Sequence, residues 1–135
     1  MNIYCCECCA VVQARLTNAE EIYPHREDLK DIPFWICNEC KNYVGCHHKT
    51  ANSTKPLGNI PTKALRNARN KIHKIFDPIW KEKKMSRSSL YFLISERLGY
   101  VYHTAYLTTI EEARKVYRII LEIRKELGIE DNPVA

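Results

Sequence analysis

Long apolar runs and a secretion signal are both missing from this 135-residue sequence. No run approaches the roughly 20 apolar residues that a membrane-spanning helix needs, so we expect no membrane association. The N-terminus lacks a charged segment followed by an apolar one, so nothing directs the chain to an oxidising compartment. We therefore expect a soluble cytoplasmic protein with reduced cysteines, because disulfides are rare in the cytosol.

Features of an enzyme are sparse as well. No cluster of carboxylates offers a site for a catalytic metal, and nothing in the sequence supplies an evident nucleophile or oxyanion donor. The sequence has no internal repeat and no low-complexity segment. The hydrophobic fraction of 45% and the charged fraction of 27% are those of an ordinary globular protein. These observations favour a folded binding module over an enzyme.

Cysteine is abundant instead, with seven residues in the chain. A C-x-x-C turn brings two thiolates to one metal ion, and two such turns complete the tetrahedral shell that zinc prefers. The odd number of cysteines and the expected reducing compartment argue against disulfides. Near the N-terminus two pairs have this spacing, Cys5 with Cys8 and Cys6 with Cys9, and we favour the first. We predict one structural Zn²⁺ held by Cys5, Cys8, Cys37 and Cys40.

Cys46 and His47 follow the second C-x-x-C turn closely and offer a further ligand pair. Because four better placed cysteines are available, we expect Cys46 to be a small buried residue and His47 to form a hydrogen bond near the site or at the surface. A contribution of Cys6, Cys9, Cys46 or His47 to metal binding stays open.

The N-terminal part of the chain, residues 1–50, has the layout of a zinc ribbon. Short runs of β-branched and aromatic residues flank the cysteine turns, and such runs are typical of strands. Two prolines and many polar residues between the two turns favour irregular structure there. We expect strands at 11–16, 34–36 and 43–44, a turn at 17–21 and a loop at 22–33.

Residues 62–135 are predicted to be mainly helical, after a connector at 51–61 that is rich in Asn, Ser, Thr, Gly and Pro. Apolar residues recur at three- and four-residue steps from Thr62 onward, which predicts an amphipathic helix. Pro78 lacks an N–H, so either this helix kinks there or Asp77 caps a short second segment.

Two further helices have clear end signals. Ser86 can cap one helix that Gly99 ends, and a capping box of Thr109 and Glu112 opens the other. Between them, residues 100–107 are rich in Tyr, Val and Thr, which predicts a strand.

These patterns together predict an α+β fold. An N-terminal zinc ribbon of short antiparallel strands is expected to pack on a C-terminal half of about three helices with one or two strands. At 135 residues the chain is short enough for the two parts to form one compact unit. Fraying is expected only at residues 131–133.

Several short motifs that are unusual together carry a family resemblance. They are Ile22-Tyr23-Pro24-His25-Arg26, Phe34-Trp35 before Cys37, Tyr43-Val44-Gly45-Cys46-His47, Pro56-Leu57-Gly58, and the spaced set His73, Asp77, Pro78 and Trp80. Over nearly its whole length the chain resembles the zinc-finger-containing domain family of unknown function that occurs in bacteriophages and prophages. The resemblance implies a small intracellular metal-binding protein of phage type and supplies no reaction. The family's first turn has Pro and Gly where this chain has Cys6 and Cys9, which supports Cys5 and Cys8 as ligands.

The surplus of positive charge lies in the middle third of the chain. The net charge is −1 over residues 1–58, +7 over residues 59–100 and −1 over residues 101–135, within a total of +5. Phosphate contacts need Lys and Arg on a rigid element, and aromatic rings can stack on bases. The candidate contacts are Lys63, Arg66, Arg69, Lys74, Lys81, Lys83, Lys84 and Arg87, with Tyr4, Trp35 and Tyr43 as stacking candidates.

A second candidate surface lies along one edge of the helix that begins near residue 62. His73 and Asp77 are four residues apart on this edge and can form a general base held by a carboxylate. They can equally form a hydrogen bond that fixes the junction at Pro78, and we favour this interpretation. The residues of the possible functional edge are His25, Arg26, His73, Asp77 and Trp80.

The residue patterns indicate a zinc-binding accessory protein that acts as a non-catalytic binding module, and the family resemblance implies that it is of phage type. Its partner is expected to be nucleic acid or a host protein, and in the second case the protein could inhibit a host system. The alternative is a small metal-dependent nuclease or hydrolase that uses His73 and Asp77.

Overall fold

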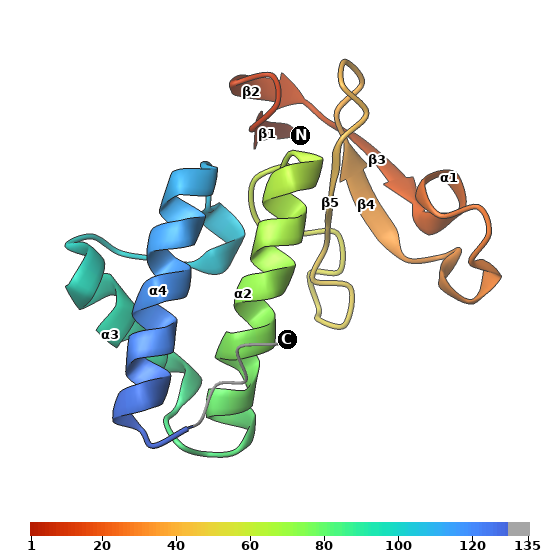
Figure 1. Ribbon diagram of the computed structural model, residues 1–135. Coiled ribbons are helices and arrows are strands. Elements are labelled where there is room, and N and C mark those ends of the chain that lie inside the picture. The colour runs from red at the N-terminus through yellow and green to blue at the C-terminus, as the bar shows by residue number, and fades with distance from the viewer. Residues whose placement is uncertain (130–135) are drawn as a thin grey trace. The chain divides into compact units, whose positions relative to one another are not determined.

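The computed structural model describes residues 1–129, in two compact units (Figure 1). One unit is Met1–Lys63, and the other begins at Ala64. The fraying predicted at residues 131–133 lies outside the described residues. Within residues 1–129, none of the helices combines the length and the apolar character that a membrane crossing demands.

The first unit contains two small antiparallel sheets. Cys5 lies opposite Ala10 in the first sheet, and Ile36 lies opposite Tyr43 in the second. Each C-x-x-C motif therefore sits in the turn of a hairpin, as a zinc ribbon requires. The strands are β1 (Asn2–Cys5) and β2 (Ala10–Gln13) in one sheet, and β3 (Arg15–Asn18), β4 (Pro33–Ile36) and β5 (Tyr43–Gly45) in the other.

The strand predicted at 11–16 is divided between the two sheets. The division falls at Ala14, whose side chain is buried and whose N–H donates to the Met1 carbonyl at 2.9 Å. The chain changes sheets there, a tertiary event that a short apolar run does not reveal.

The turn predicted at 17–21 was wrong, because β3 runs on to Asn18 and the short helix α1 (Ala19–Ile22) follows. The Asn18 side chain caps this helix by accepting from the Glu20 N–H at 3.1 Å. The loop predicted at 22–33 contains one 3₁₀ turn, η1 (Glu27–Leu29).

The segment expected to act as a connector, residues 51–61, hydrogen-bonds to both sheets of the first unit. Leu57 N–H donates to the Gly45 carbonyl at 2.9 Å, on the side of β5. Ile60 N–H donates to the Tyr4 carbonyl and its own carbonyl accepts from Cys6 N–H, both at 2.9 Å. The Ile60 side chain is fully buried, so this segment closes the unit.

The core of the first unit is small and surrounds the cysteines. Its buried members are drawn from both sheets and from residue 60, and the side chains of the C-x-x-C motifs contribute to it directly. They are Ile3, Cys5, Ala14, Cys37, Val44 and Ile60, with Cys8, Val12, Trp35 and Cys40 packed against them.

The second unit is helical. Its elements are α2 (Lys63–Lys81), which starts one residue before the unit, α3 (Arg87–Leu98), η2 (Thr104–Tyr106) and α4 (Ile110–Glu126). Strands at the N-terminus followed by three helices confirm the predicted α+β class. That the ribbon packs on the helices to form one compact unit stays a prediction.

The helix ends follow the local signals of the sequence. Ser86 accepts from Ser89 N–H at 3.1 Å, and Gly99 ends α3 in the left-handed conformation, with φ 88°. Thr109 accepts from Glu112 N–H at 3.1 Å at the start of α4. The helix ends predicted at Ser86, Gly99 and Thr109 are therefore present.

Helix α2 continues through Pro78 to Lys81. Proline removes the hydrogen bond that the Lys74 carbonyl would otherwise accept. The Arg124 guanidinium donates to the neighbouring Ile75 carbonyl at 2.9 Å, in the turn that precedes Pro78. Of the two alternatives at Pro78, the separate segment capped by Asp77 does not occur.

The strand predicted at 100–107 was wrong. Tyr102, Thr104 and Leu107 are buried, whereas Val101 is 92% exposed. The Tyr102 N–H donates to the Ser95 hydroxyl of α3 at 2.9 Å instead of to a neighbouring strand. The described part of the second unit contains no strand with which this segment could pair. The aromatic and β-branched residues that resemble a strand are in part side chains buried in the helical unit.

Candidate metal centre

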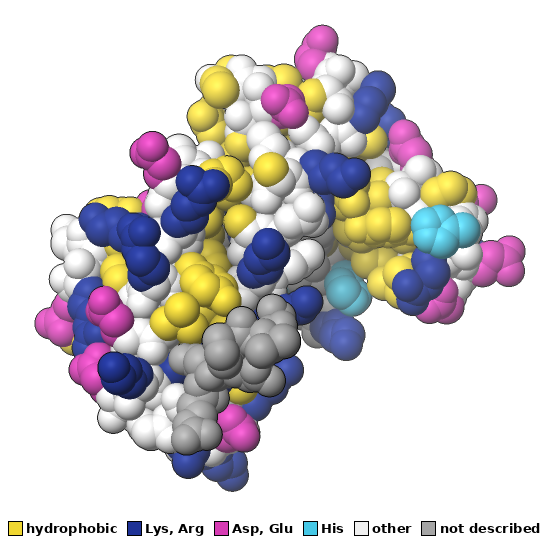
Figure 2. All heavy atoms as spheres, in the orientation of Figure 1, with side chains coloured by type: hydrophobic (Ala, Val, Ile, Leu, Met, Phe, Trp, Pro, Cys, Tyr) yellow, Lys and Arg dark blue, Asp and Glu magenta, His cyan; other side chains and the backbone are white. Residues whose placement is uncertain are grey.

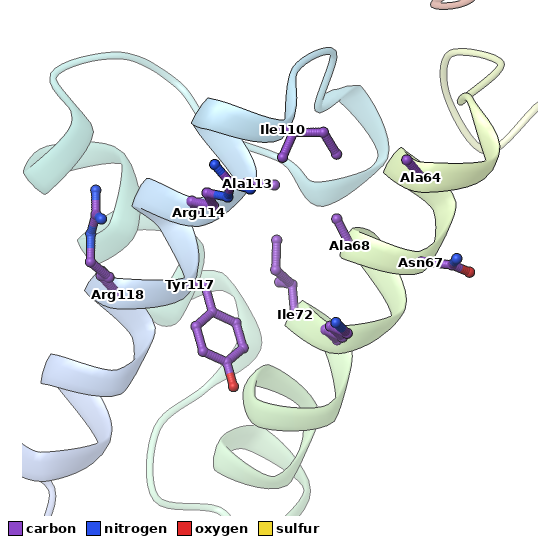
Figure 3. Close-up of a pocket in the computed structure, with 10 residues that line it drawn as sticks. Ala64, Asn67, Ala68, Ile72, Ile110, Ala113, Arg114, Tyr117 and Arg118 are labelled. Atoms are coloured by element: carbon purple, nitrogen blue, oxygen red, sulfur yellow. The ribbon is translucent and has the colours of Figure 1, made fainter. Parts of the chain in front are cut away.

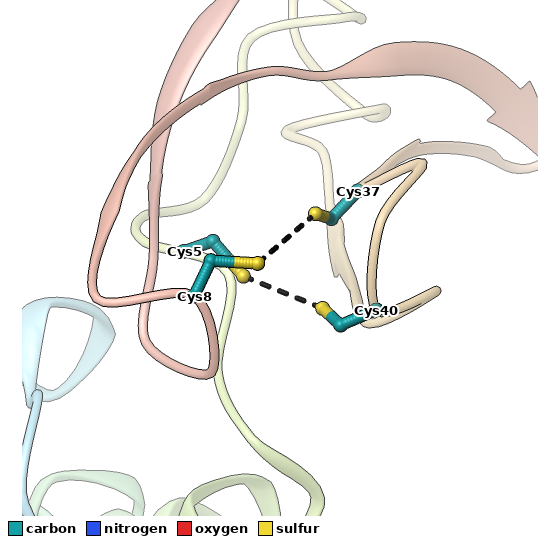
Figure 4. A group of neighbouring side chains, drawn as sticks. All are labelled: Cys5, Cys8, Cys37 and Cys40. Atoms are coloured by element: carbon teal, nitrogen blue, oxygen red, sulfur yellow. Dashed lines mark hydrogen bonds between the residues drawn. The ribbon is translucent and has the colours of Figure 1, made fainter.

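The two hairpin turns bring Cys5, Cys8, Cys37 and Cys40 together (Figure 4). Their four sulfur atoms all lie within 4.8 Å of one another. Cys5 Sγ is 3.5 Å from Cys40 Sγ, and Cys8 Sγ is 3.7 Å from Cys37 Sγ. Each close pair joins the two hairpins, so a metal bound here would cross-link the two sheets.

These distances fit a tetrahedral zinc site. Four sulfurs at about 2.3 Å from one Zn²⁺ are separated by about 3.8 Å along each edge of the tetrahedron. Disulfide bonds require about 2.05 Å, so the four thiols are not bonded to one another. The donor set and its spacing fit one structural Zn²⁺, as predicted. All four positions of the shell come from the protein, which is the arrangement of structural rather than catalytic zinc.

The residue after each C-x-x-C motif supports this choice of ligands. Cys9 has φ 54° and Lys41 has φ 65°, both in the left-handed region that favours glycine. Lys41 N–H donates to the Cys37 carbonyl at 2.9 Å and closes its turn. Both turns place a left-handed residue directly after the second ligand, so Cys9 takes the position of a turn residue.

The remaining cysteines lie outside the cluster. Cys9 Sγ donates to the Cys6 carbonyl at 3.4 Å, and Cys46 is a buried thiol whose pKa is raised by burial. His47 is exposed, and His48 Nδ1 is 3.3 Å from the Cys46 carbonyl. No second metal-binding group of three or more His, Cys, Asp or Glu residues occurs among residues 1–129.

Burial and hydrogen bonds control the protonation of the metal-free thiols. Burial raises the pKa of Cys5, and the hydrogen bond with Cys37 raises the pKa of Cys8. Burial also acts to raise the pKa of Cys37, but hydrogen bonds from the backbone of Cys40 and Glu39 outweigh it and lower that pKa. Zinc takes thiolates, so its binding releases the thiol protons and should strengthen as pH rises.

Asn42 is a neighbour of the site that the sequence did not single out. Its side-chain amide donates to Cys40 Sγ at 3.3 Å, and its carbonyl accepts from Cys37 N–H at 2.8 Å. Such donors hold a ligating sulfur in place and moderate its charge. The sequence signal for it is a polar amide two residues after Cys40.

The predicted phosphate contacts divide into exposed and unavailable side chains. Arg69 is only 9% exposed and its guanidinium donates to the Leu107 carbonyl at 2.5 Å, which corrects its prediction as a phosphate contact. An arginine beside an apolar face turns inward when a carbonyl meets it, and sequence alone does not reveal the carbonyl. Arg66 is half-buried. The exposed members are Lys63, Lys74, Lys81, Lys83, Lys84 and Arg87.

Asp77 joins the side chains of the predicted functional edge on α2. Its Oδ1 lies 3.3 Å from His73 Nδ1 and accepts from Trp80 Nε1 at 3.2 Å. One carboxylate oxygen thus links the turn before Pro78 to the turn after it. This geometry supports the interpretation in which the pair fixes the junction.

His25 and Arg26, the other members of that edge, have partners within the first unit. Arg26 forms a two-point ion pair with Asp28, at 3.0 and 2.9 Å. The His25 ring meets the Tyr23 ring edge-on, with 6.5 Å between centroids. Each side chain therefore has a local structural role.

The aromatic stacking candidates Tyr4, Trp35 and Tyr43 are half-buried. Trp35 Nε1 donates to the Thr54 carbonyl at 2.7 Å, and the Tyr43 hydroxyl lies 2.7 Å from the Tyr23 hydroxyl. Packing and hydrogen bonds therefore already engage two of the three rings.

Comparison with known proteins gives a family but no individual relative. Neither a curated protein nor a solved structure matches the chain. The sequence pattern of a family described as a zinc-finger-containing domain matches residues 2–126. The matched region includes all four clustered cysteines and all three long helices. The chain therefore belongs to this zinc-finger-containing domain family.

Proposed function

We propose that this zinc-finger domain is a non-catalytic module that binds nucleic acid through the exposed basic face of α2 and the turn that follows it. Cys5, Cys8, Cys37 and Cys40 would hold the structural Zn²⁺, which stabilises the first unit when bound. The metal takes no part in chemistry in this proposal.

The observation that carries the proposal is a row of unpaired cations. None of Lys63, Lys74, Lys81, Lys83, Lys84 and Arg87 forms an ion pair with another described residue. Elsewhere in the second unit, Arg97 is paired with Glu122 and Glu126 at 3.7 and 2.8 Å. Unpaired cations on a rigid element are available to phosphates.

The spacing of these cations suits an extended polyanion. At about 100° per residue, Lys63, Lys74 and Lys81 lie on one line along α2. That line is about 27 Å long at 1.5 Å per residue, which corresponds to about eight base pairs of duplex DNA. A backbone lying along α2 would meet several of these ammonium groups.

The end of α2 concentrates the charge further. Lys83 adopts φ 59°, and Lys84 N–H donates to the Ile79 carbonyl at 3.0 Å, which together form a left-handed helix cap. Two cations lie over the Trp80 ring, with Lys81 Nζ 5.6 Å and the Arg87 guanidinium 5.5 Å from its centroid. Cations and an indole ring therefore gather at one end of the proposed surface.

The alternative function, a nuclease or hydrolase, has less support. The four clustered cysteines would fill the shell of one zinc ion and leave no open position, and Asp77 is engaged by both His73 and Trp80. A catalytic base would need a nearby nucleophile or oxyanion donor, and the hydrogen bonds of this edge supply neither.

A salt titration of oligonucleotide binding tests the proposal. If Lys74 meets a phosphate, the logarithm of affinity should fall with the logarithm of salt at about −0.9 per contact on duplex DNA, and Lys74→Ala should reduce the slope by about one. Lys115→Ala is the matched control, because this exposed lysine lies on α4 outside the proposed surface.

Two results would reject nucleic acid as the ligand. One is no binding of duplex or single-stranded oligonucleotides at low salt, and the other is binding that responds equally to the two lysine variants. A host protein would then be the expected partner. Metal-dependent cleavage by the wild type that is lost in His73→Ala at unchanged thermal stability would instead favour the enzyme.

A further inference from the structure

A groove lies between α2 and α4 on the surface of the second unit (Figure 3). Its volume is about 540 Å³. The side chains of Ala68 and Ile72 on α2 and of Tyr117 on α4 point into the space between the helices. The groove lies on a different side of α2 from Lys63, Lys74 and Lys81, at about 100° around the helix axis.

Small side chains explain why the groove is hollow. Ala64 and Ala68 are one helical turn apart on α2, and Ala113 faces them from α4. Where neighbouring helices present larger residues, ridges fill such a space. Ile72 and Ile110 complete a floor that is mainly aliphatic.

The border of the groove is basic. Lys71, Arg114 and Arg118 line it, and no Asp or Glu does. All three side chains are exposed, and none forms an ion pair with another described residue. Figure 2 shows yellow hydrophobic surface bordered by dark blue basic side chains over α2 and α4. An apolar floor and a cationic border therefore occur together.

We propose that this groove binds an acidic amphipathic helix from a partner protein. A helix laid between two others buries its apolar stripe against the aliphatic floor, as in other helix-in-groove complexes. Acidic residues beside that stripe would meet Lys71, Arg114 and Arg118, so charge complementarity selects an acidic helix over a basic one.

A nucleic acid fits the groove less well than a helix does. Phosphates would lie over alanine and isoleucine side chains that offer them no donor, and burying charge there is costly. Base stacking needs open aromatic faces, and Tyr117 is the one aromatic residue of the lining. The proposal therefore adds a protein partner to the nucleic-acid surface, on a separate side of α2.

A pair of matched peptides tests the proposal on the zinc-loaded full chain. Both are fluorescein-labelled 18-residue helices with leucine at the i, i+3, i+4 and i+7 positions, one with glutamate and the other with lysine on the flanks. Fluorescence anisotropy should show binding of the acidic peptide at least tenfold tighter than that of the basic one. Amide chemical shifts of the ¹⁵N-labelled protein should change around Ala68 and Arg114.

Variants of the groove then distinguish binding of the acidic peptide in the groove from its general attraction to a basic protein. Ala68→Glu places bulk and a like charge in the floor, and Arg118→Glu reverses one border charge at an exposed position. Each should lower the affinity for the acidic peptide at least tenfold. Lys115→Glu, on α4 outside the lining, should change that affinity less than threefold. Thermal denaturation checks that each variant folds, and Arg118→Glu decides the test if Ala68→Glu does not.

Three outcomes would overturn the proposal. They are no binding of the acidic peptide, equal loss in Arg118→Glu and Lys115→Glu, and shift changes around Ala68 caused by oligonucleotides but not by peptide. The Lys74→Ala variant distinguishes this site from the proposed nucleic-acid surface. It should lower the affinity for oligonucleotides and leave the affinity for the acidic peptide unchanged.

Discussion

The two units of this chain reach a stable fold by different routes. Strands of the first unit are only three or four residues long, and Cys5, Cys37 and Cys46 are part of its buried core. The three helices of the second unit are 19, 12 and 17 residues long and enclose a core of aliphatic side chains around Phe76. Short elements bury too little apolar surface to fold alone, so a metal ion takes over part of the role of the core.

The largest expected difference between the two units follows from removing a zinc ligand. Cys37→Ser or Cys40→Ser should abolish stoichiometric zinc and unfold the first unit, because binding on the order of 10 to 16 kcal/mol is coupled to folding. The helices of the second unit should keep their far-ultraviolet circular dichroism. Metal analysis and ¹H–¹⁵N spectra measure the two effects separately.

Cys6→Ser is the control for this experiment, because Cys6 lies outside the four-sulfur cluster and should retain one zinc per chain. Stoichiometric zinc in either Cys37→Ser or Cys40→Ser would contradict the site. Loss of zinc in Cys6→Ser would instead show that the first turn uses another pair.

The converse experiment weakens the second unit and spares the metal. Phe76 is fully buried, and its ring packs on Tyr91 with centroids 4.7 Å apart. Phe76→Ala should lower the free energy of unfolding by about 3 to 5 kcal/mol, measured by urea denaturation of the helical signal. Zinc content should stay at one per chain. Loss of the metal together with the helices would mean that the two units do not fold independently.

The smallest expected effects concern the left-handed lysines, one in each unit. Lys41→Gly and Lys83→Gly should each stabilise the unit that carries the residue by about 0.5 to 1 kcal/mol, because glycine adopts positive φ without strain. Resistance of zinc to a competing chelator reports on Lys41→Gly, and the urea midpoint reports on Lys83→Gly. A loss of stability in either variant would show that the lysine side chain contributes more than its backbone strain costs.

Local signals in the sequence were sufficient for the metal site and the helix ends. The two C-x-x-C turns predicted a site of four thiols around one ion. The family resemblance supported Cys5 and Cys8 over Cys6 and Cys9, which have the same spacing. Ser86, Gly99 and Thr109 marked helix boundaries because capping depends on a few adjacent residues.

Features that depend on distant contacts were not predictable in the same way. Residues 100–107 are rich in Tyr, Val and Thr like a strand, but Tyr102, Thr104 and Leu107 are buried in a unit whose described part contains helices and no strand. In the sequence Arg69 looks like the other basic residues of α2. Its burial depends on a hydrogen bond to the Leu107 carbonyl, 38 positions away. The groove between α2 and α4 depends on how Ala68 and Ala113 are juxtaposed, and neither alanine signals it alone.

The four-thiolate shell also has an electrostatic consequence for encounters in solution. Four thiolates and one Zn²⁺ carry a charge of about −2, which adds to the net −1 of residues 1–58, while residues 59–100 carry +7. The zinc-loaded first unit would therefore repel a polyanion while the basic residues of α2 attract it, and at low ionic strength this attraction would speed the association of α2 with a polyanion. Encounters would then favour α2 over the cysteine turns, a preference that weakens as the screening length shortens to about 8 Å in physiological salt.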